Sequence, residues 1–128
     1  MKYFKIMFSV ILFSVLNASP AVAIAPDGDP LPTPEEYAEY LNCHFFECSE
    51  YDNFYKIINK ESNWNPTAQN KTSTAFGLGQ FLNSTWQTVG YTKTDDPYIQ
   101  LDATVAYIKQ RYGTPTNAWK FHVIHNYY

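Results

Sequence analysis

Positive charge is sparse in this 128-residue chain, and no stretch of it is dense in lysine or arginine. Nine basic and twelve acidic residues give a formal net charge of −3. Nucleic-acid-binding proteins concentrate Lys and Arg on one face or along one helix, so the composition excludes that class. The length corresponds to one domain.

Strand-like alternation of apolar and polar residues is nearly absent, and no segment is repeated. Helix signals take its place. Thr33, Pro34 and Glu36 form a capping box before the first of these helices, and Asp96 with Pro97 precedes the longest one. Ser84 and Gln87 suggest a further capping box for a short helix that Gly90 closes. The fold class is therefore all-α, with helices expected over residues 34–42, 52–61, 84–90, 97–112 and 116–124.

Only two cysteines occur, Cys43 and Cys48. In an oxidising compartment they are most simply one local disulfide, which would fix the start of the following helix. A zinc site would need more ligands nearby than His44 alone supplies. We therefore expect a disulfide between the two.

Long apolar runs are missing except at the N-terminus, where Ile6 to Leu16 follows a basic start. Ala21-Val22-Ala23 then fits the small-residue cleavage pattern of a signal peptide. This predicts a signal peptide over residues 1–23, cleaved after Ala23, and hence a secreted or periplasmic protein. The alternative is an uncleaved membrane anchor, for which an eleven-residue run falls short of the about 20 apolar residues that a span needs. We expect no stable anchor after cleavage.

The remaining chain is uneven in charge. Removal of residues 1–23 leaves seven basic and twelve acidic residues, a net charge of −5. Residues 24–52 hold eight acids and no base, whereas residues 53–128 carry a net charge of +3. The expected organisation after the signal peptide is a Pro/Asp/Gly linker, an N-terminal helix with the cysteine loop, and a main domain, over residues 24–33, 34–52 and 53–128 respectively.

Glu61 lies on the apolar face of a predicted helix. Phe54, Ile57 and Ile58 precede it by seven, four and three residues, which is the spacing of one helix face. Desolvation and the negative end of the helix dipole would both raise the pKa of Glu61, and Trp64 follows closely enough to wall it from water. A carboxyl group that is protonated near neutral pH suits a general acid for glycosidic cleavage. The alternative is a Glu that reaches out of a helix end, the common case.

Three segments occur in the order found in the lytic transglycosylase and goose-type lysozyme superfamily. They are "ESNWNPTAQN" from Glu61, "AFGLGQF" from Ala75 and "YIKQRYGTPTNAW" from Tyr107, and the resemblance extends from about Phe54 to Tyr128. It implies a small lysozyme-like domain that cleaves the β-1,4 bond between N-acetylmuramic acid and N-acetylglucosamine in peptidoglycan. It also implies glycan strands as the partner, no metal or organic cofactor, and a monomer.

By this resemblance Glu61 is the catalytic acid/base, and the substrate-binding residues are Ser62, Gly77, Leu78, Gln80 and Tyr107. Glycine lets a backbone approach a sugar ring closely, and the amide of Gln80, as donor and acceptor, suits an N-acetyl group. Tyr107 would hold Glu61 through its hydroxyl. The structural alternatives are a simple turn glycine at Gly77, a surface amide at Gln80 and an ordinary half-buried aromatic residue at Tyr107.

The chain has no Asp or Glu between Glu61 and Asp95. Ordinary glycoside hydrolases need two carboxylates, but Asp96 is explained as a helix cap and Asp102 lies toward the polar flank of its helix. Asp95 is a loop residue of the kind that is usually solvated. With one carboxylate, the muramic 6-hydroxyl closes on C1 and water is not consumed, which predicts 1,6-anhydromuramyl products.

Three other interpretations stay open. They are a hydrolytic muramidase, a non-catalytic glycan-binding module, and a small disulfide-bearing interaction protein whose acidic residues 24–52 are the functional part.

His122 and His125 have helical i, i+3 spacing that invites a metal site. Because two ligands do not make a site, we interpret them as packing or hydrogen-bonding groups.

Overall fold

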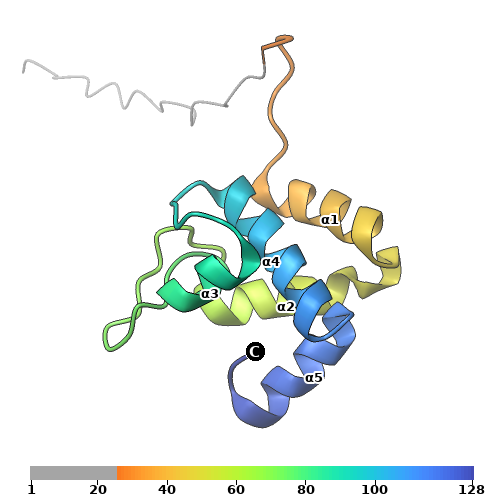
Figure 1. Ribbon diagram of the computed structural model, residues 1–128. Helices are drawn as coiled ribbons and strands as arrows, with labels where there is room; N and C mark the ends of the chain where they lie inside the picture. The colour runs from red at the N-terminus through yellow and green to blue at the C-terminus, as the bar shows by residue number, and fades with distance from the viewer. Residues whose placement is uncertain (1–25) are drawn as a thin grey trace, which may run out of the picture. The chain divides into compact units, whose positions relative to one another are not determined.

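The computed structural model describes residues 26–128, which fall into a short segment up to Leu31 and a larger unit, Pro32–Tyr128. The predicted signal peptide lies outside the described residues. Among the described residues there are isolated bridges but no strand, so the all-α prediction is confirmed. Figure 1 shows the helices of the larger unit, which are α1 (Pro34–Phe45), the 3₁₀ turn η1 (Cys48–Glu50), α2 (Tyr51–Ser62), α3 (Asn83–Val89), α4 (Pro97–Arg111) and α5 (Pro115–His125).

Two of the helix starts are capped as the sequence predicts. The Thr33 hydroxyl accepts a hydrogen bond from the Glu36 N–H at 3.2 Å, and the Glu36 carboxylate accepts one from the Thr33 N–H at 2.8 Å. The Asp96 carboxylate accepts from the first N–H groups of α4. These bonds satisfy backbone donors that have no partner within their own helix.

The predicted capping box of α3 is wrong. The N-cap residue is Leu82, two residues before the expected Ser84, so the helix begins at Asn83, and Leu82 makes no side-chain cap bond. The Thr74 hydroxyl accepts from the Asn83 N–H at 3.1 Å instead. Because a loop side chain supplies this acceptor, Ser84 is free to lie within the helix. Gly90 does close α3, in the left-handed region at φ +79°.

The main hydrophobic core joins α1, α2, α4 and α5. In this unit α2 packs against α1 and α5, while α4 packs against α1, α3 and α5. The residues buried in this core are Ala38, Leu41, Phe54, Ile57, Ile58, Leu78, Leu101, Val105, Ile108 and Ala118. A second cluster, Phe81, Trp86, Ala103 and Tyr107, joins α3 to α4. Together the two clusters fix the positions of α2, α4 and α5 relative to one another.

The segment before α2 is tied down at several points. A disulfide joins Cys43 of α1 to Cys48 of η1, and the Asn42 side chain donates to the Glu47 carbonyl at 3.0 Å. The Glu50 carboxylate accepts from both the N–H and the hydroxyl of Thr116, which links η1 to the start of α5. These contacts hold the beginning of α2 against α5. No helix within residues 26–128 is long and apolar enough to cross a membrane.

Candidate active site

Glu61 lies in the last turn of α2. The helix ends at Ser62 because Asn63, its C-cap residue, has left-handed backbone dihedrals, and Trp64 is left-handed as well. The helix thus ends one residue beyond Glu61, where the sequence predicts its end. Left-handed residues at a helix end turn the chain sharply away from the axis, which leaves the Glu61 side chain beside open space.

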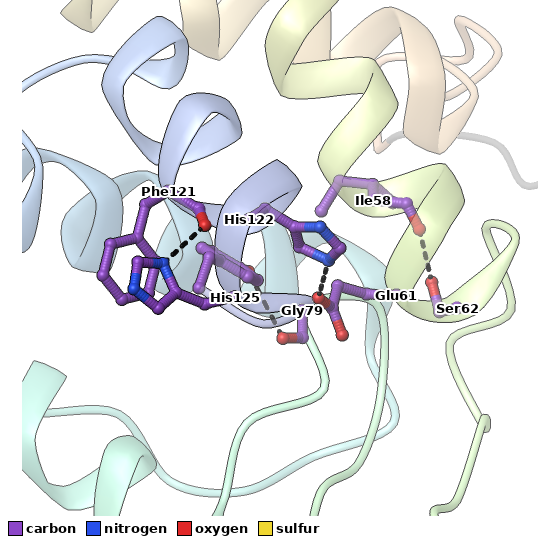
Figure 2. A network of polar contacts seen from close by, with 8 residues as sticks. Ile58, Glu61, Ser62, Gly79, Phe121, His122 and His125 are labelled. Carbon is purple, nitrogen blue, oxygen red and sulfur yellow. Dashed lines mark hydrogen bonds and ion pairs between the residues drawn. The ribbon is translucent and has the colours of Figure 1, made fainter.

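The closest polar partner of Glu61 is His122 of α5. Its Nε2 lies 2.7 Å from Glu61 Oε1, and the side chains of His122 and Glu61 are 4% and 16% exposed. Figure 2 shows the imidazole reaching from α5 to one carboxyl oxygen, while the second oxygen points away from it. The Trp119 ring stacks on the imidazole with centroids 5.5 Å apart. His122 is thus held by Trp119 of its own helix and by Glu61 at the end of α2.

Burial raises the pKa of Glu61 above its ordinary value of 4.5, because the charged form loses hydration. His122 opposes this shift by its charge and its hydrogen bond, and Lys60 adds a smaller opposing contribution. Burial is the largest of these effects, so the net direction is upward. The structure thus shows the desolvation of Glu61 that the apolar spacing of α2 predicts. This desolvation favours the protonated form of the side chain.

Glu61 opens onto a hollow of about 450 Å³. It is also lined by loop residues that include Gly79 and Gln80, and by Tyr107, Arg111 and Tyr128. Asp95 is exposed, Asp96 caps α4, and Asp102 accepts a hydrogen bond from the Tyr37 hydroxyl at 2.9 Å. Within residues 26–128, Glu61 therefore has the one acidic side chain that lines this hollow.

The loop from Gly77 to Gln80 is held by neutral hydrogen bonds. The Leu78 N–H donates to the buried Gln100 side chain at 2.7 Å, and Leu78 itself is fully buried. Gly77 has a φ of +81°, and a Cβ there would lie 2.6 Å from the Gln100 amide. The Gln80 amide donates to the carbonyls of Ala68 and Gly77, both at 2.9 Å. Its two N–H groups are thus engaged, and only its oxygen is left to meet a ligand.

The other expected site residues divide. Tyr107 lines the hollow, but its hydroxyl accepts a hydrogen bond from Arg111 at 2.8 Å rather than holding Glu61. Ser62 is 9% exposed, is absent from the lining, and donates its hydroxyl to the Ile58 carbonyl at 3.1 Å. The structure therefore brings Glu61, Gln80 and Tyr107 to one hollow. Ser62, Gly77 and Leu78 do not line it.

Three residues of the site were not predicted as site residues from the sequence: Arg111 and Tyr128, which line the hollow, and His122, which contacts Glu61 but does not itself line it. The Tyr128 hydroxyl donates to the Gly79 carbonyl at 3.3 Å, and burial raises the pKa of this tyrosine well above its ordinary value. Pro115, Ala118 and His122 share the buried face of α5, so helical spacing could have indicated that His122 points inward. Nothing in the sequence indicates that it meets Glu61.

The two histidines of α5 do not converge on a common ligand. His125 is exposed, and its Nδ1 lies 2.9 Å from the Phe121 carbonyl of its own helix. In the part of the chain that the structure describes, no group of three or more His, Cys, Asp or Glu side chains could hold a metal ion. His122 instead serves Glu61.

Comparison with protein families gives a match. A family model described as "Transglycosylase SLT domain" matches residues 47–127, which include Glu61, the Gly77–Gln80 loop and His122. No curated protein and no solved structure matches the chain. The match spans more than half of the 128 residues, and it confirms the resemblance drawn from the sequence motifs. The chain belongs to the transglycosylase SLT domain family.

Proposed function

We propose that the protein is an exported enzyme that cleaves the β-1,4 bond between N-acetylmuramic acid and N-acetylglucosamine in peptidoglycan by the lytic route. The observation that carries this proposal is the place of Glu61: a largely buried carboxyl group, whose pKa burial raises, at a hollow whose lining within residues 26–128 has no second acidic side chain. A hydrolase of the ordinary type would need that second group.

In the proposed reaction, protonated Glu61 donates its proton to the glycosidic oxygen as the bond to muramic C1 breaks. The substrate's own N-acetyl carbonyl stabilises the positive charge that develops at C1. The Glu61 carboxylate then takes the proton from the muramic 6-hydroxyl, whose oxygen closes on C1. Glu61 ends protonated as it began, no water is consumed, and the product is a 1,6-anhydromuramyl end.

His122 acts in this scheme as a positioning residue. Its Nε2 engages Glu61 Oε1 at 2.7 Å and leaves the second carboxyl oxygen for the substrate. A carboxyl group fixed by one strong hydrogen bond loses less rotational freedom when it transfers a proton, which lowers the barrier. The same hydrogen bond lowers the Glu61 pKa and so offsets part of the rise that burial causes.

Mass spectrometry of murein digested by the purified protein tests the route. Lytic cleavage gives anhydromuramyl fragments that are lighter by one water than the reducing-end fragments of hydrolysis. Digestion with the Glu61→Gln variant, prepared in parallel, controls for a contaminating muramidase. Products dominated by the hydrated form would make the protein a hydrolytic muramidase. Tight murein binding without any product would make it a glycan-binding module.

Export is the second part of the proposal, and it rests on the signal-peptide pattern of residues 1–23. The exported protein should begin at Ile24. N-terminal sequencing of protein recovered outside the cytoplasm checks this, and recovery of the uncleaved chain in membranes would favour an anchor instead.

A further inference from the structure

Arg111 is the second charged residue at the hollow. Among the described residues that line it, Glu61 and Arg111 are the two with charged side chains, and the other side chains are neutral. Arg111 lies at the end of α4 and is exposed, so it borders the open part of the hollow. A glycan in the hollow would therefore meet one acid and one guanidinium.

The Arg111 side chain is held in place by aromatic residues. One guanidinium nitrogen donates to the Tyr107 hydroxyl at 2.8 Å. The guanidinium carbon lies 5.7, 5.6 and 6.0 Å from the ring centres of Tyr107, Tyr112 and Phe121. Cation–π contacts of this kind and a hydrogen bond restrict an otherwise flexible side chain. The cation is thus preorganised without being neutralised.

Within residues 26–128 no carboxylate lies within ion-pair distance of this cation; the one contact of that kind there, between His122 and Glu61, does not involve Arg111. Guanidinium has five N–H donors in a rigid fork that matches the two oxygens of a carboxylate. Tyr107 occupies one of these donors, so several are left for an anion in the hollow. A neutral sugar ring would not use such a group fully.

We propose that Arg111 binds a carboxylate carried by the muramyl residue of the substrate. This inference rests on the proposed function, because it names a part of the glycan that the hollow receives. Two sources present this chemistry: the lactyl carboxylate of muramic acid that has lost its peptide, and a carboxylate of an attached stem peptide. The binding site is the same for both, and the ligands of the test separate them.

Binding is measured by calorimetry in the Glu61→Gln background, where turnover does not consume the ligand. The four probes are a muramyl tetrasaccharide with free lactyl groups, the same sugar with its lactyl groups converted to methyl amides, the peptide-bearing tetrasaccharide, and chitotetraose. Adding Arg111→Gln should weaken binding of a carboxylate-bearing probe by about 10-fold, since exposed charge-assisted pairs are of modest strength. Binding of the neutral probes should stay within about twofold.

A loss confined to the free lactyl probe assigns the lactyl carboxylate, and a loss confined to the peptide-bearing probe assigns the stem peptide. Arg111→Lys should keep part of the affinity, because the charge remains and the fork does not. Lys109→Gln is the matched control: the same helix loses one charge, from an ammonium 5.4 Å from the Phe45 ring centre, in a separate hollow. It should change no probe.

Equal losses for all four probes would mean that Arg111 only supports Tyr107, and this would overturn the inference. Unchanged binding of every probe, or binding of none by the parent protein, would overturn it as well. The proposed function fails separately: wild-type protein that leaves murein intact while its carboxylate binding depends on Arg111 would sink the enzyme and leave the binding site standing.

Discussion

The two walls of the hollow are held by different kinds of bond. The helical wall is Glu61 on α2, which one hydrogen bond joins to a second titratable side chain, His122 of α5, outside the lining of the hollow. The loop wall is Gly79 and Gln80, and their loop, residues 77–80, is held by bonds among backbone and amide groups that do not titrate. Of these two walls, only the helical wall contains a side chain, Glu61, whose charge changes with pH.

This difference separates chemistry from shape. The loop wall presents a fixed surface because Gln100, buried beneath it, satisfies the Leu78 N–H and donates to the carbonyls of Pro66 and Thr94, both at 2.8 Å. The helical wall has a single bond and one free carboxyl oxygen. We therefore expect substitutions in the helical wall to change turnover and those in the loop wall to change stability.

The largest effect is expected for Glu61→Gln. Glutamine keeps the size and one acceptor but has no acidic proton to donate, so turnover of murein should fall by roughly 10²- to 10⁴-fold. Murein turnover assays with purified protein measure this. Undiminished turnover would remove Glu61 from the mechanism.

The same variant should not be less stable at neutral pH. The folded-state pKa of Glu61 is raised, so between pH 4.5 and that raised pKa the folded chain binds more protons than the unfolded chain, and the free energy of unfolding falls as pH rises through this window. The glutamine side chain that replaces Glu61 does not titrate, so this loss disappears in the variant. Urea unfolding at several pH values compares the slopes, and a steeper fall for the variant would contradict the pKa direction.

The second largest effect belongs to the loop wall. Gln100→Ala leaves the Leu78 N–H without its acceptor and two carbonyls without their donor, and should reduce the free energy of unfolding by about 2–4 kcal/mol. Gln110→Ala is the control, because Gln110 is exposed on the same helix. Equal effects of the two substitutions in denaturant unfolding would show that Gln100 does not hold the wall.

Much of the fold could be predicted from local sequence, and the active-site contacts could not. Thr33 and Asp96 act within a few residues of their own helix starts, so their patterns are readable. The α3 start was wrong because its acceptor, Thr74, comes from a loop nine residues earlier. Glu61 was found because its own helix makes it face inward. Its partner His122 is 61 residues away, and only packing of α5 on α2 brings them together.

The third effect tests that partnership. His122→Phe keeps a planar ring but removes the hydrogen bond, so turnover at the optimum should fall by about 10-fold. Because His122 holds the Glu61 pKa down against burial, its loss should raise that pKa further. Glu61 would then stay protonated to higher pH, and the alkaline limb of the pH–turnover profile should move upward.

His125→Phe is the matched control for this profile. It removes an imidazole from the same helix, but one that is exposed and contacts its own backbone. A profile that moves with His125→Phe, or that fails to move with His122→Phe, would show that the hydrogen bond does not set the acidity of Glu61.

The smallest effect is expected at Ser62, where the structure and the family resemblance point in different directions. The resemblance puts this hydroxyl in the glycan groove, where its loss would remove a substrate hydrogen bond and raise KM by roughly 2- to 12-fold. In the structure successive helical residues differ by about 100° in direction, and Ser62, unlike Glu61, does not line the hollow. Its hydroxyl bonds the Ile58 carbonyl, a bond internal to the helix, and Ser62→Ala leaves no buried donor without a partner.

The variant should therefore keep KM and turnover within about twofold. It should change the free energy of unfolding by no more than about 0.5 kcal/mol, because alanine is the better helix former. Murein kinetics and urea unfolding on one preparation measure both quantities. A clear rise in KM at unchanged stability would place Ser62 on the glycan, and would mean that its side chain turns toward the hollow when substrate binds.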